Sequence, residues 1–387
     1  MLALGFEGDL PNFRVDLARL DDTADFVAGV IRENYPSLQV PLHARWRHFV
    51  FTGRDLWADA ARKANFADAE ARARAEFDLA IVSVLLDAGA GPDWRYKDAE
   101  TGLTLGRSEG LALASLRMFE AGLFSDNPRA PLRADARRLA ALTVEDLTRG
   151  FTVTAANPMA GLEGRALLLS RLGRAILDSG KAFAQHDKPR PGGLFDILVA
   201  SADTTLAAPS ILHEVLVRLN PIWPDRLTLG GVPLGDTWRH RAIKRNDASN
   251  GMVPLHKLSQ WLTYSLIEPL QRAGVSVTEI DGLTGLAEYR NGGLFVDAGL
   301  IALRETARAE GSYTVDSELV VEWRALTVAL LDRLAPLVRE RLGVAASDFP
   351  LGALLEGGTW AAGRKLASEL RPEGGPPYKI VSDGTAF

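Results

Sequence analysis

The 387-residue sequence contains no cysteine. Disulfide bonds, thiolate nucleophiles and cysteine-ligated zinc sites are therefore excluded together. No apolar run approaches the roughly 20 residues that a membrane-spanning helix needs, and the first residues lack the basic and apolar regions of a secretory signal. We expect a soluble, cytoplasmic protein with no membrane partner.

An excess of basic charge is missing as well. The formal net charge is -5 and the pI is about 5.8, whereas proteins that bind extended nucleic acid carry clustered lysine and arginine. Nucleic acid is therefore not expected as a partner. With 47% hydrophobic and 24% charged residues, the rest of the composition is that of a globular protein long enough for one large domain or two smaller ones.

The common catalytic motifs are also absent: there is no Walker loop, no GxGxxG after a strand, no HExxH and no GxSxG. His43 and His48 have no carboxylate pair near them in the sequence, so we predict capping or an active-site hydrogen bond for them and no metal site. The pair Gly357–Gly358 precedes a predicted helix, whose N-terminus could bind an anion, although a plain turn is the favoured interpretation.

Helical periodicity dominates what is present. Apolar residues at intervals of three and four predict helices over residues 22–34, 66–87, 107–121, 135–150, 162–183, 194 onward, 210–219 and 317–342. Alternation around Gly230–Gly231 predicts a small β-hairpin. We therefore predict a mainly α protein with a few short hairpins, arranged as two helical lobes, 1–155 and 156–387, of one integrated globular unit.

Residues 254–299 concentrate polar and aromatic side chains. The pattern predicts a helix, a turn, and then Glu288, Tyr289 and Arg290 in succession, followed by the pair Gly292–Gly293, which we expect to be flexible. From the residue types alone, Glu288 and Arg290 are better explained as a structural ion pair than as catalytic groups.

Long and unusual strings link the chain to a known family. FRVDLARLD, RWRHF, SVLLDAGAGPDWRY, PLHKLSQWLTYSLIEPL, GLTGLAEYRNGG, LEGGTWAAGR and IVSDGTAF resemble the uracil-regulated, or uracil catabolism protein four, family that is found in bacteria and fungi beside uracil-catabolism genes. The resemblance covers nearly the whole chain. It implies a place in pyrimidine degradation more than a particular reaction.

A second, more distant resemblance bears on the reaction. From Leu162 onward the order of features is similar to that of the queuosine salvage proteins, which are all-helical N-glycosidases related to DNA glycosylases. HKLSQWLTYSLIEP is similar to their KRAQ helix, DGLTGLAEYR to their LTMFADYR, VVEWRALTV to their EVEIRA and, more loosely, LLDAGAGPDW to their DxLNFSFW. Ser265 stands where that family has an acidic residue for a large base, which implies a smaller leaving group here.

Together the resemblances imply a hydrolase that cleaves ribosylurea, or its 5′-phosphate, to urea and ribose or ribose 5-phosphate. They assign Glu288 to the face beneath C1′, where a carboxylate would stabilise an oxocarbenium-like transition state or activate water, and Asp87 or Glu322 to protonation of the leaving group. The substrate-binding residues they imply are Lys257, Gln260, Trp261, Ser265, Tyr289, Arg290, Arg324, Trp94, His48 and Asp383. No metal or cofactor is expected, and the partner is a small ribosyl or ribosyl-phosphate compound. The sequence leaves homo-oligomerisation open.

Each assignment has a structural alternative. Glu322 lies at the edge of an apolar stripe and could be a buried carboxylate bonded to Arg324 or to a backbone N–H. Lys257 could be a solvated helix residue, Trp261 could belong to the core, and Asp383 could cap a turn. At the level of function, the alternatives are a hydrolase of another pyrimidine-derived nucleotide and a non-catalytic partner of the pathway enzymes.

Overall fold

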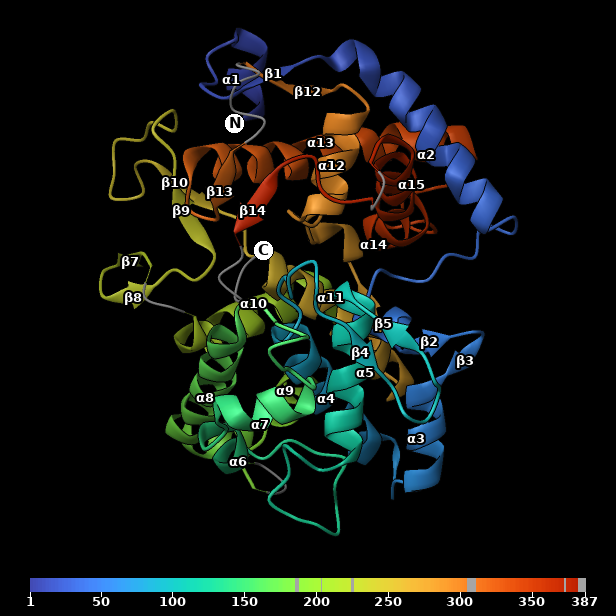
Figure 1. The fold of residues 1–387 in the computed structure, drawn as a ribbon, viewed down its shortest axis with the longest axis vertical. Coiled ribbons are helices and arrows are strands. Elements are labelled where there is room, and N and C mark those ends of the chain that lie inside the picture. The colour runs from blue at the N-terminus through green and yellow to red at the C-terminus, as the bar shows by residue number, and fades with distance from the viewer. Residues whose placement is uncertain (185–187, 203, 224–225, 305–310, 372–373, 382–387) are drawn as a thin grey trace. The chain divides into compact units, whose positions relative to one another are not determined.

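The computed structural model describes residues 1–184, 188–202, 204–223, 226–304, 311–371 and 374–381. Asp383, one of the predicted substrate-binding residues, lies outside these ranges. The fold is mainly helical, as predicted, and its short strands pair two by two (Figure 1). None of the described helices combines the length and apolarity that crossing a membrane would require.

The α-helices are α1 (Leu2–Glu7), α2 (Leu20–Asn34), α3 (Leu56–Ala64), α4 (Ala69–Leu85), α5 (Arg107–Glu120), α6 (Ala136–Ala140), α7 (Val144–Gly150), α8 (Leu162–Asp178), α9 (Gly193–Ala200), α10 (Ala208–Arg218), α11 (Lys257–Arg272), α12 (Tyr289–Asp297), α13 (Glu318–Leu342), α14 (Leu351–Leu354) and α15 (Trp360–Leu370). A π-helical turn, Leu355–Thr359, joins α14 to α15. Short 3₁₀ turns cover Leu17–Arg19, Arg45–Phe49, Gly180–Phe183, Asn220–Ile222 and Ile280–Gly282.

The antiparallel strand pairs are β1 (Phe13–Val15) with β12 (Ile301–Leu303), β2 (Val50–Phe51) with β3 (Arg54–Asp55), β4 (Tyr96–Lys97) with β5 (Thr104–Leu105), β7 (Thr228–Leu229) with β8 (Val232–Pro233) and β9 (Thr237–Arg239) with β10 (Met252–Pro254). The parallel pairs are β6 (Thr205–Ala207) with β11 (Ser276–Thr278) and β13 (Ser312–Thr314) with β14 (Lys379–Val381). The sequence predicted short hairpins, but the pairs that involve β1, β6 and β13 join segments far apart in the chain.

Local chemistry explains where several elements begin and turn. The predicted hairpin is confirmed: Gly230 and Gly231 have φ angles of 57° and 80°, which fit a two-residue turn between β7 and β8 that only glycine adopts without strain. The helix predicted over residues 135–150 is two helices, α6 and α7, because Thr143 and Asp146 form a capping box that starts α7 afresh.

The chain divides into two compact units that are each discontinuous in sequence. Unit 1 comprises residues 1–43, 225–260 and 280–381, and unit 2 comprises residues 44–224, 261–279 and 382–387, of which the last six are not described. Helix α11 passes from one unit to the other after Gln260. The sequence predicted a division near residue 155, whereas contacts between distant segments define units that no single cut in the chain separates.

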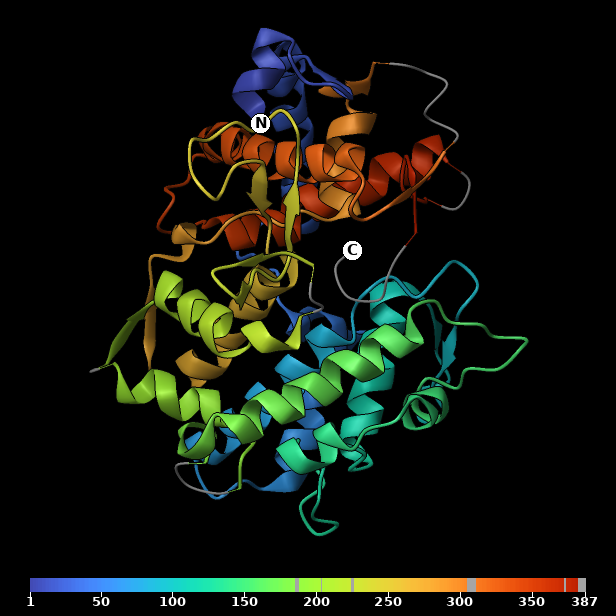
Figure 2. The ribbon, with the colours of Figure 1, turned by 90° about the vertical axis from the view of Figure 1, so that its left-hand side faces the viewer.

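Unit 1 is built on helix packing around α13. Its predicted apolar stripe is buried at Leu319, Trp323, Leu326, Leu330 and Leu334. Helix α2 packs along α13, and α12 packs on both α13 and α15, which Figures 1 and 2 show as blue, orange and red helices lying together. This arrangement places the loop before α12 close to the first half of α13.

Two glycine pairs have roles other than those predicted. Gly292 and Gly293 are not a flexible link but lie inside α12, where a Cβ on Gly292 would come 2.8 Å from the indole of Trp323. Gly357 and Gly358 lie within the continuous helical run from α14 to α15, so they form neither a turn nor a helix N-terminus for an anion. A Cβ on Gly358 would come 2.9 Å from Val27 in α2. Both pairs allow helices to approach closely.

Unit 2 is a second helical core. Helix α4, buried from Phe77 through Leu85, packs against α5, α8 and α9, and α6 lies along α8 (Figure 2). The 3₁₀ turn Arg45–Phe49 packs on α5 and α4 and is itself largely buried. The strand β6 pairs in parallel with β11, which follows α11.

Candidate functional site

A buried ion pair organises the polar residues of unit 1. Asp236 and Arg324 form two parallel hydrogen bonds, of 2.8 Å from Nη1 and 2.7 Å from Nη2, and Arg324 Nε donates to the carbonyl of Ala287. Burial alone would raise the pKa of Asp236, but the charge and hydrogen bonds of Arg324 outweigh it and hold that pKa below its ordinary value. Arg324, predicted to bind substrate, is therefore engaged in a bidentate ion pair.

The start of α11 wraps around Asp236. The backbone N–H groups of Leu255 and His256 donate to the Asp236 carbonyl at 2.9 and 3.2 Å, and the N–H of Lys257 donates to its carboxylate at 2.9 Å. These bonds hold His256 at a φ of 47°, a left-handed conformation that costs energy for any residue with a Cβ. Within the described residues, Nδ1 of His256 is buried without a hydrogen-bond partner.

The environment of His256 keeps its imidazole neutral. Burial lowers its pKa from the ordinary value of 6.5, the charge of Asp236 raises it, and that of Arg324 lowers it further, with a net decrease. Functional sites often contain residues with a strained backbone or a shifted pKa. His256, half-buried at the start of α11, has both.

Glu288 caps the N-terminus of α12. Its carboxylate accepts the backbone N–H groups of Arg290 and Asn291, each at 2.6 Å, and the residue as a whole remains partly exposed to solvent. Burial of the carboxyl group raises the pKa of Glu288, while the two N–H groups and then the charges of Lys257 and Arg290 oppose the increase. Glu288 was predicted to form an ion pair with Arg290, but in the structure it is mainly a helix cap.

Arg290 and Asn291 are buried, and each has a polar atom that is not hydrogen-bonded within the described residues. Arg290 donates from Nη1 to the carbonyl of Gly374 at 2.8 Å and lies 4.9 Å from the ring of Tyr289. In the part of the chain that the structure describes, Arg290 Nε and Asn291 Oδ1 are buried without hydrogen-bond partners. The first turn of α12 therefore places these two polar atoms beside the Glu288 carboxyl group, whose pKa is raised.

Lys257 and Gln260 lie on the first turn of α11 in the same unit. Both are buried, so Lys257 is not the solvated helix residue considered above. Gln260 accepts the N–H of Thr284 at 3.1 Å and so connects α11 to the loop that leads to Glu288. The structure thus brings Lys257, Gln260 and Glu288 into one region of unit 1.

Glu322 is tied to the backbone of the N-terminal segment. One carboxylate oxygen accepts the N–H of Asn12 and that of Phe13, at 3.2 and 2.7 Å, and the other oxygen contacts Asn12 Nδ2 at 3.0 Å and His240 Nε2 at 3.1 Å. The side chain has no exposed surface. This geometry matches the structural alternative for Glu322, that of a buried carboxylate bonded to backbone N–H groups.

Unit 2 contains a second buried cluster, around Arg45 and Asp87. Arg45 is fully buried; its Nε donates to Ser83 at 2.6 Å and its Nη1 lies 3.1 Å from Asp87 Oδ1. Asp87 accepts the hydroxyl of Ser108 at 3.1 Å. Burial lowers the pKa of Arg45, and the charge of Asp87 opposes the decrease.

The remaining predicted residues also lie in unit 2. Ser265 accepts the N–H of Arg45 at 2.9 Å and donates to the carbonyl of Trp261. The Trp261 ring lies 5.5 Å from the Arg45 guanidinium and 5.7 Å, edge to face, from His48. Trp94 is a core residue, whose indole donates to the carbonyl of Phe151 at 3.0 Å. Asp87, Trp261, Ser265 and His48 are thus brought together around Arg45.

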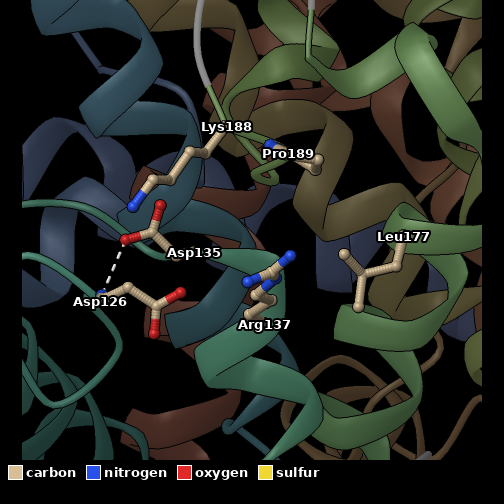
Figure 3. A pocket seen from close by; sticks show the side chains of 6 residues that line it. All are labelled: Asp126, Asp135, Arg137, Leu177, Lys188 and Pro189. Atoms are coloured by element: carbon tan, nitrogen blue, oxygen red, sulfur yellow. Dashed lines mark hydrogen bonds between the residues drawn. The ribbon is translucent and has the colours of Figure 1, made fainter.

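Unit 2 also contains a pocket. A pocket of about 220 Å³ in unit 2 is lined by Asp126, Asp135, Arg137, Leu177, Lys188 and Pro189 (Figure 3). Asp135 at its wall accepts the N–H of Asp126 at 2.8 Å and Arg133 Nε at 2.9 Å, which gives it a structural role. Among the described residues, no three histidine, aspartate or glutamate side chains gather closely enough to hold a metal ion.

Sequence reasoning missed Arg45, Asp236 and His256. Arg45 occurs in RWRHF, between the helices predicted over residues 22–34 and 66–87, and Asp236 follows the hairpin with no periodic signal. His256 directly precedes Lys257, and that adjacency to a predicted site residue is the one local signal that could have selected it.

The structure is that of a mainly helical protein with buried ion pairs in both units. A family model described as "Protein of unknown function (DUF1688)" matches residues 1–387, and the chain belongs to that family. It is 42% identical over 387 residues to Protein urg3 of Schizosaccharomyces pombe, with 98% of this chain and 92% of that protein covered. It is 35% identical over 419 residues to Uracil catabolism protein 4 of Lachancea kluyveri, with 98% and 93% covered. The family resemblance predicted from the sequence strings is confirmed.

Proposed function

We propose that this chain takes part in uracil catabolism by hydrolysing the N-glycosidic bond of ribosylurea or of its 5′-phosphate. The name of the Lachancea kluyveri relative supports the pathway. The resemblance of the Lys257, Gln260 and Glu288 motifs to queuosine salvage glycosidases supports the reaction class and a related helical fold. The observation that carries the proposal is the Glu288 carboxyl group, whose pKa is raised by burial, beside the charge of Lys257, in a residue that keeps some exposure to solvent.

The reaction needs one water molecule and no net redox change. The water oxygen forms a bond to C1′, the C1′–N bond breaks with its electron pair going to the urea nitrogen, and the proton lost by water is returned to that nitrogen. Positive charge develops on the ribose ring as the bond breaks. In the proposal, Glu288 faces C1′, stabilises this charge and accepts the proton of the attacking water.

A raised pKa suits Glu288 to this role, because a general base works best with a pKa nearer the working pH. Lys257 is the cation that we assign to a 5′-phosphate or to the departing nitrogen. Glu322 has no assigned role, because its side chain has no exposed surface, whereas Glu288 is partly exposed.

The test is an assay of purified full-length protein with ribosylurea and, separately, its 5′-phosphate. We expect one of the two to yield urea and an equimolar amount of ribose or ribose 5-phosphate. The substitution Glu288→Gln should lower kcat/KM by about 100-fold or more. The acid limb of the pH profile should lie above pH 4.5, the ordinary pKa of a glutamate.

A matched control is Asp55→Asn, the same carboxylate-to-amide change at the N-cap of α3, where Asp55 accepts the N–H of Ala58 at 2.9 Å. It should leave activity unchanged. Absence of urea from the assays of both compounds would refute the assigned reaction. Equal activity in the two variants would refute the role of Glu288. Full activity in Glu288→Gln would leave this carboxylate as a helix cap only.

A further inference from the structure

Asp236 uses both oxygens of its carboxylate, and each oxygen accepts two hydrogen bonds. Oδ1 accepts Trp238 Nε1 at 2.6 Å and Arg324 Nη1 at 2.8 Å. Oδ2 accepts Arg324 Nη2 at 2.7 Å and the backbone N–H of Lys257 at 2.9 Å. A carboxylate offers about four acceptor positions, so all of those on Asp236 are occupied. Asp236 and Arg324 are both buried, so bulk water does not compete for these bonds.

One side of this network holds the start of α11. Besides the bond from the Lys257 N–H to the carboxylate, the N–H groups of Leu255 and His256 donate to the Asp236 carbonyl at 2.9 and 3.2 Å. His256 has a φ of 47°, and a left-handed backbone at a residue with a Cβ persists only while its surroundings enforce it. Asp236 is therefore needed to keep Lys257 in its place.

The other side of the network holds the residue before Glu288. Arg324 Nε donates to the carbonyl of Ala287 at 3.2 Å, and Ala287 is buried. Nε and the two terminal nitrogens belong to one rigid, planar guanidinium, so the two parallel bonds to Asp236 also fix the direction of the third donor. Glu288 directly follows Ala287 and caps α12. The orientation of Arg324 thus determines where the backbone of Glu288 lies.

The two residues that the network holds also interact with each other. Burial raises the pKa of Glu288, and the charge of Lys257 is among the effects that oppose the increase. Such an interaction weakens as two groups separate, so it reports whether Lys257 stays near Glu288. Arg290, the other cation that acts on Glu288, is held separately by its bond to the carbonyl of Gly374.

We propose that Asp236 is a positioning residue, which together with Arg324 holds Lys257 and Glu288 at a fixed separation so that both act on the same substrate. All four residues belong to unit 1. The inference rests on the proposed function for the roles of Lys257 and Glu288. It gives Arg324 a positioning role in place of the substrate contact that the sequence resemblance implied.

Asp236→Asn is the sharpest substitution because it changes the hydrogen bonds and hardly changes the volume. An amide has one acceptor oxygen and an NH₂ group that donates. In one orientation the NH₂ faces the donors of Trp238 and Arg324, and in the other it faces those of Arg324 and Lys257. In either orientation the two parallel bonds from Arg324 cannot both form.

The test is a double-mutant cycle in the full-length protein that measures the pKa of Glu288 by carbon NMR of labelled glutamate carboxyl groups. The signal of Glu288 is the one missing from Glu288→Gln. Lys257→Met alone should raise this pKa, because a charge that lowers it is removed. In the Asp236→Asn protein, Lys257→Met should shift the pKa by less than about half as much, since Lys257 no longer lies beside Glu288. The direct effect of the charge of Asp236 cancels within the cycle.

Asp297→Asn is the matched control. Asp297, the last residue of α12, accepts two parallel hydrogen bonds from Arg371, at 2.9 and 2.6 Å, and its side chain is also buried. Loss of that pair should leave the pKa shift caused by Lys257→Met at its full size. The proposal is overturned if Lys257→Met causes no shift in the unmodified protein, the same shift in Asp236→Asn, or an equally reduced shift in Asp297→Asn.

An assay with ribosylurea and its 5′-phosphate completes the test. We expect kcat/KM to fall about tenfold or more in Asp236→Asn and to stay unchanged in Asp297→Asn; equal values in Asp236→Asn and the unmodified protein would contradict the positioning role. The NMR cycle needs no turnover, so a protein that releases no urea but shows the expected cycle refutes the proposed reaction alone. If Asp236→Asn does not fold, Arg324→Lys replaces it in the cycle, because lysine keeps the charge and lacks the planar fork.

Discussion

Glu322 shows what a single buried carboxylate can do for the fold at the residue scale. It accepts hydrogen bonds from the backbone of Asn12 and Phe13 and contacts His240, and so joins helix α13 to the segment that leads into β1 and to the residue after β9. A buried carboxylate with these partners is costly to replace, since its donors would be left without an acceptor.

We therefore expect Glu322→Gln to lower the free energy of unfolding by about 3 kcal/mol, because the new amide N–H₂ faces donors instead of accepting from them. Guanidinium denaturation measures the change. Glu318→Gln, in the first turn of the same helix and partly exposed, should cost less than about 1 kcal/mol. Equal effects of the two substitutions would contradict a special role for Glu322.

The raised pKa of Glu288 predicts a pH dependence of stability. Folded Glu288 keeps its proton at pH values where the unfolded chain, with a pKa near 4.5, has already lost it. The stabilising contribution of protonation is thus complete below about pH 4.5 and is lost as the pH rises through the higher folded pKa. The free energy of unfolding of the unmodified protein, relative to that of Glu288→Gln, should therefore decrease as the pH rises through the folded pKa of Glu288.

Denaturation of both proteins at a series of pH values between 4 and 8 would check this expectation. A stability difference that stays constant, or that grows with pH, would show that the cap bonds to Arg290 and Asn291 outweigh burial.

The residue scale is where the sequence alone is weakest. The sequence predicts an ion pair between Glu288 and Arg290, but the structure makes Glu288 a helix cap because the nearest donors are backbone N–H groups.

At the scale of elements, glycines decide how closely helices pack. Gly292 in α12 faces Trp323 and Thr327 of α13, whose atoms lie 2.8 and 2.9 Å from the position of an added Cβ. We expect Gly292→Ala to lower stability by about 1–3 kcal/mol, since strain from overpacking exceeds the gain of about 1 kcal/mol in helix propensity.

Gly29 in α2 is the control for this substitution. It is helical and exposed, and nothing lies within 4 Å of an added Cβ. Gly29→Ala should raise stability by up to about 1 kcal/mol. Thermal or chemical denaturation measures the change in stability of each variant. Changes of opposite sign support the packing argument, whereas a gain in stability in both variants would show that the α12–α13 contact relaxes freely.

The elements themselves were largely predictable. Periodicity located α2, α5, α8 and α13 to within a few residues, except that the end predicted for α8 is a separate 3₁₀ turn, Gly180–Phe183. Glycine pairs were predicted badly, because the same dipeptide serves a turn at Gly230–Gly231 and a helix contact at Gly357–Gly358. Only the neighbouring helix, which is distant in sequence, distinguishes the two cases.

At the scale of the whole molecule, each unit is assembled from separated segments. Residues 1–43 belong to unit 1 and pack with residues 280–381, whereas residues 44–155 belong to unit 2. We therefore predict that fragments 1–155 and 156–387, produced separately, will not unfold cooperatively, because β1 would lack β12 and α2 would lack α13. Circular dichroism melts of the fragments, alone and mixed, test this. Independent cooperative melting of either fragment would restore a boundary near residue 155.

The sequence by itself determined the helical class, most helix positions, the Gly230–Gly231 hairpin and the family, because periodicity, turn chemistry and long shared strings are local properties of the chain. Tertiary structure decided which polar groups meet. Asp236 finds Arg324, Glu322 finds the backbone of Asn12, and Arg45 finds Asp87 across separations of 88, 310 and 42 residues. Such pairs are selected by burial, where unpaired charge is expensive, and no local pattern records them.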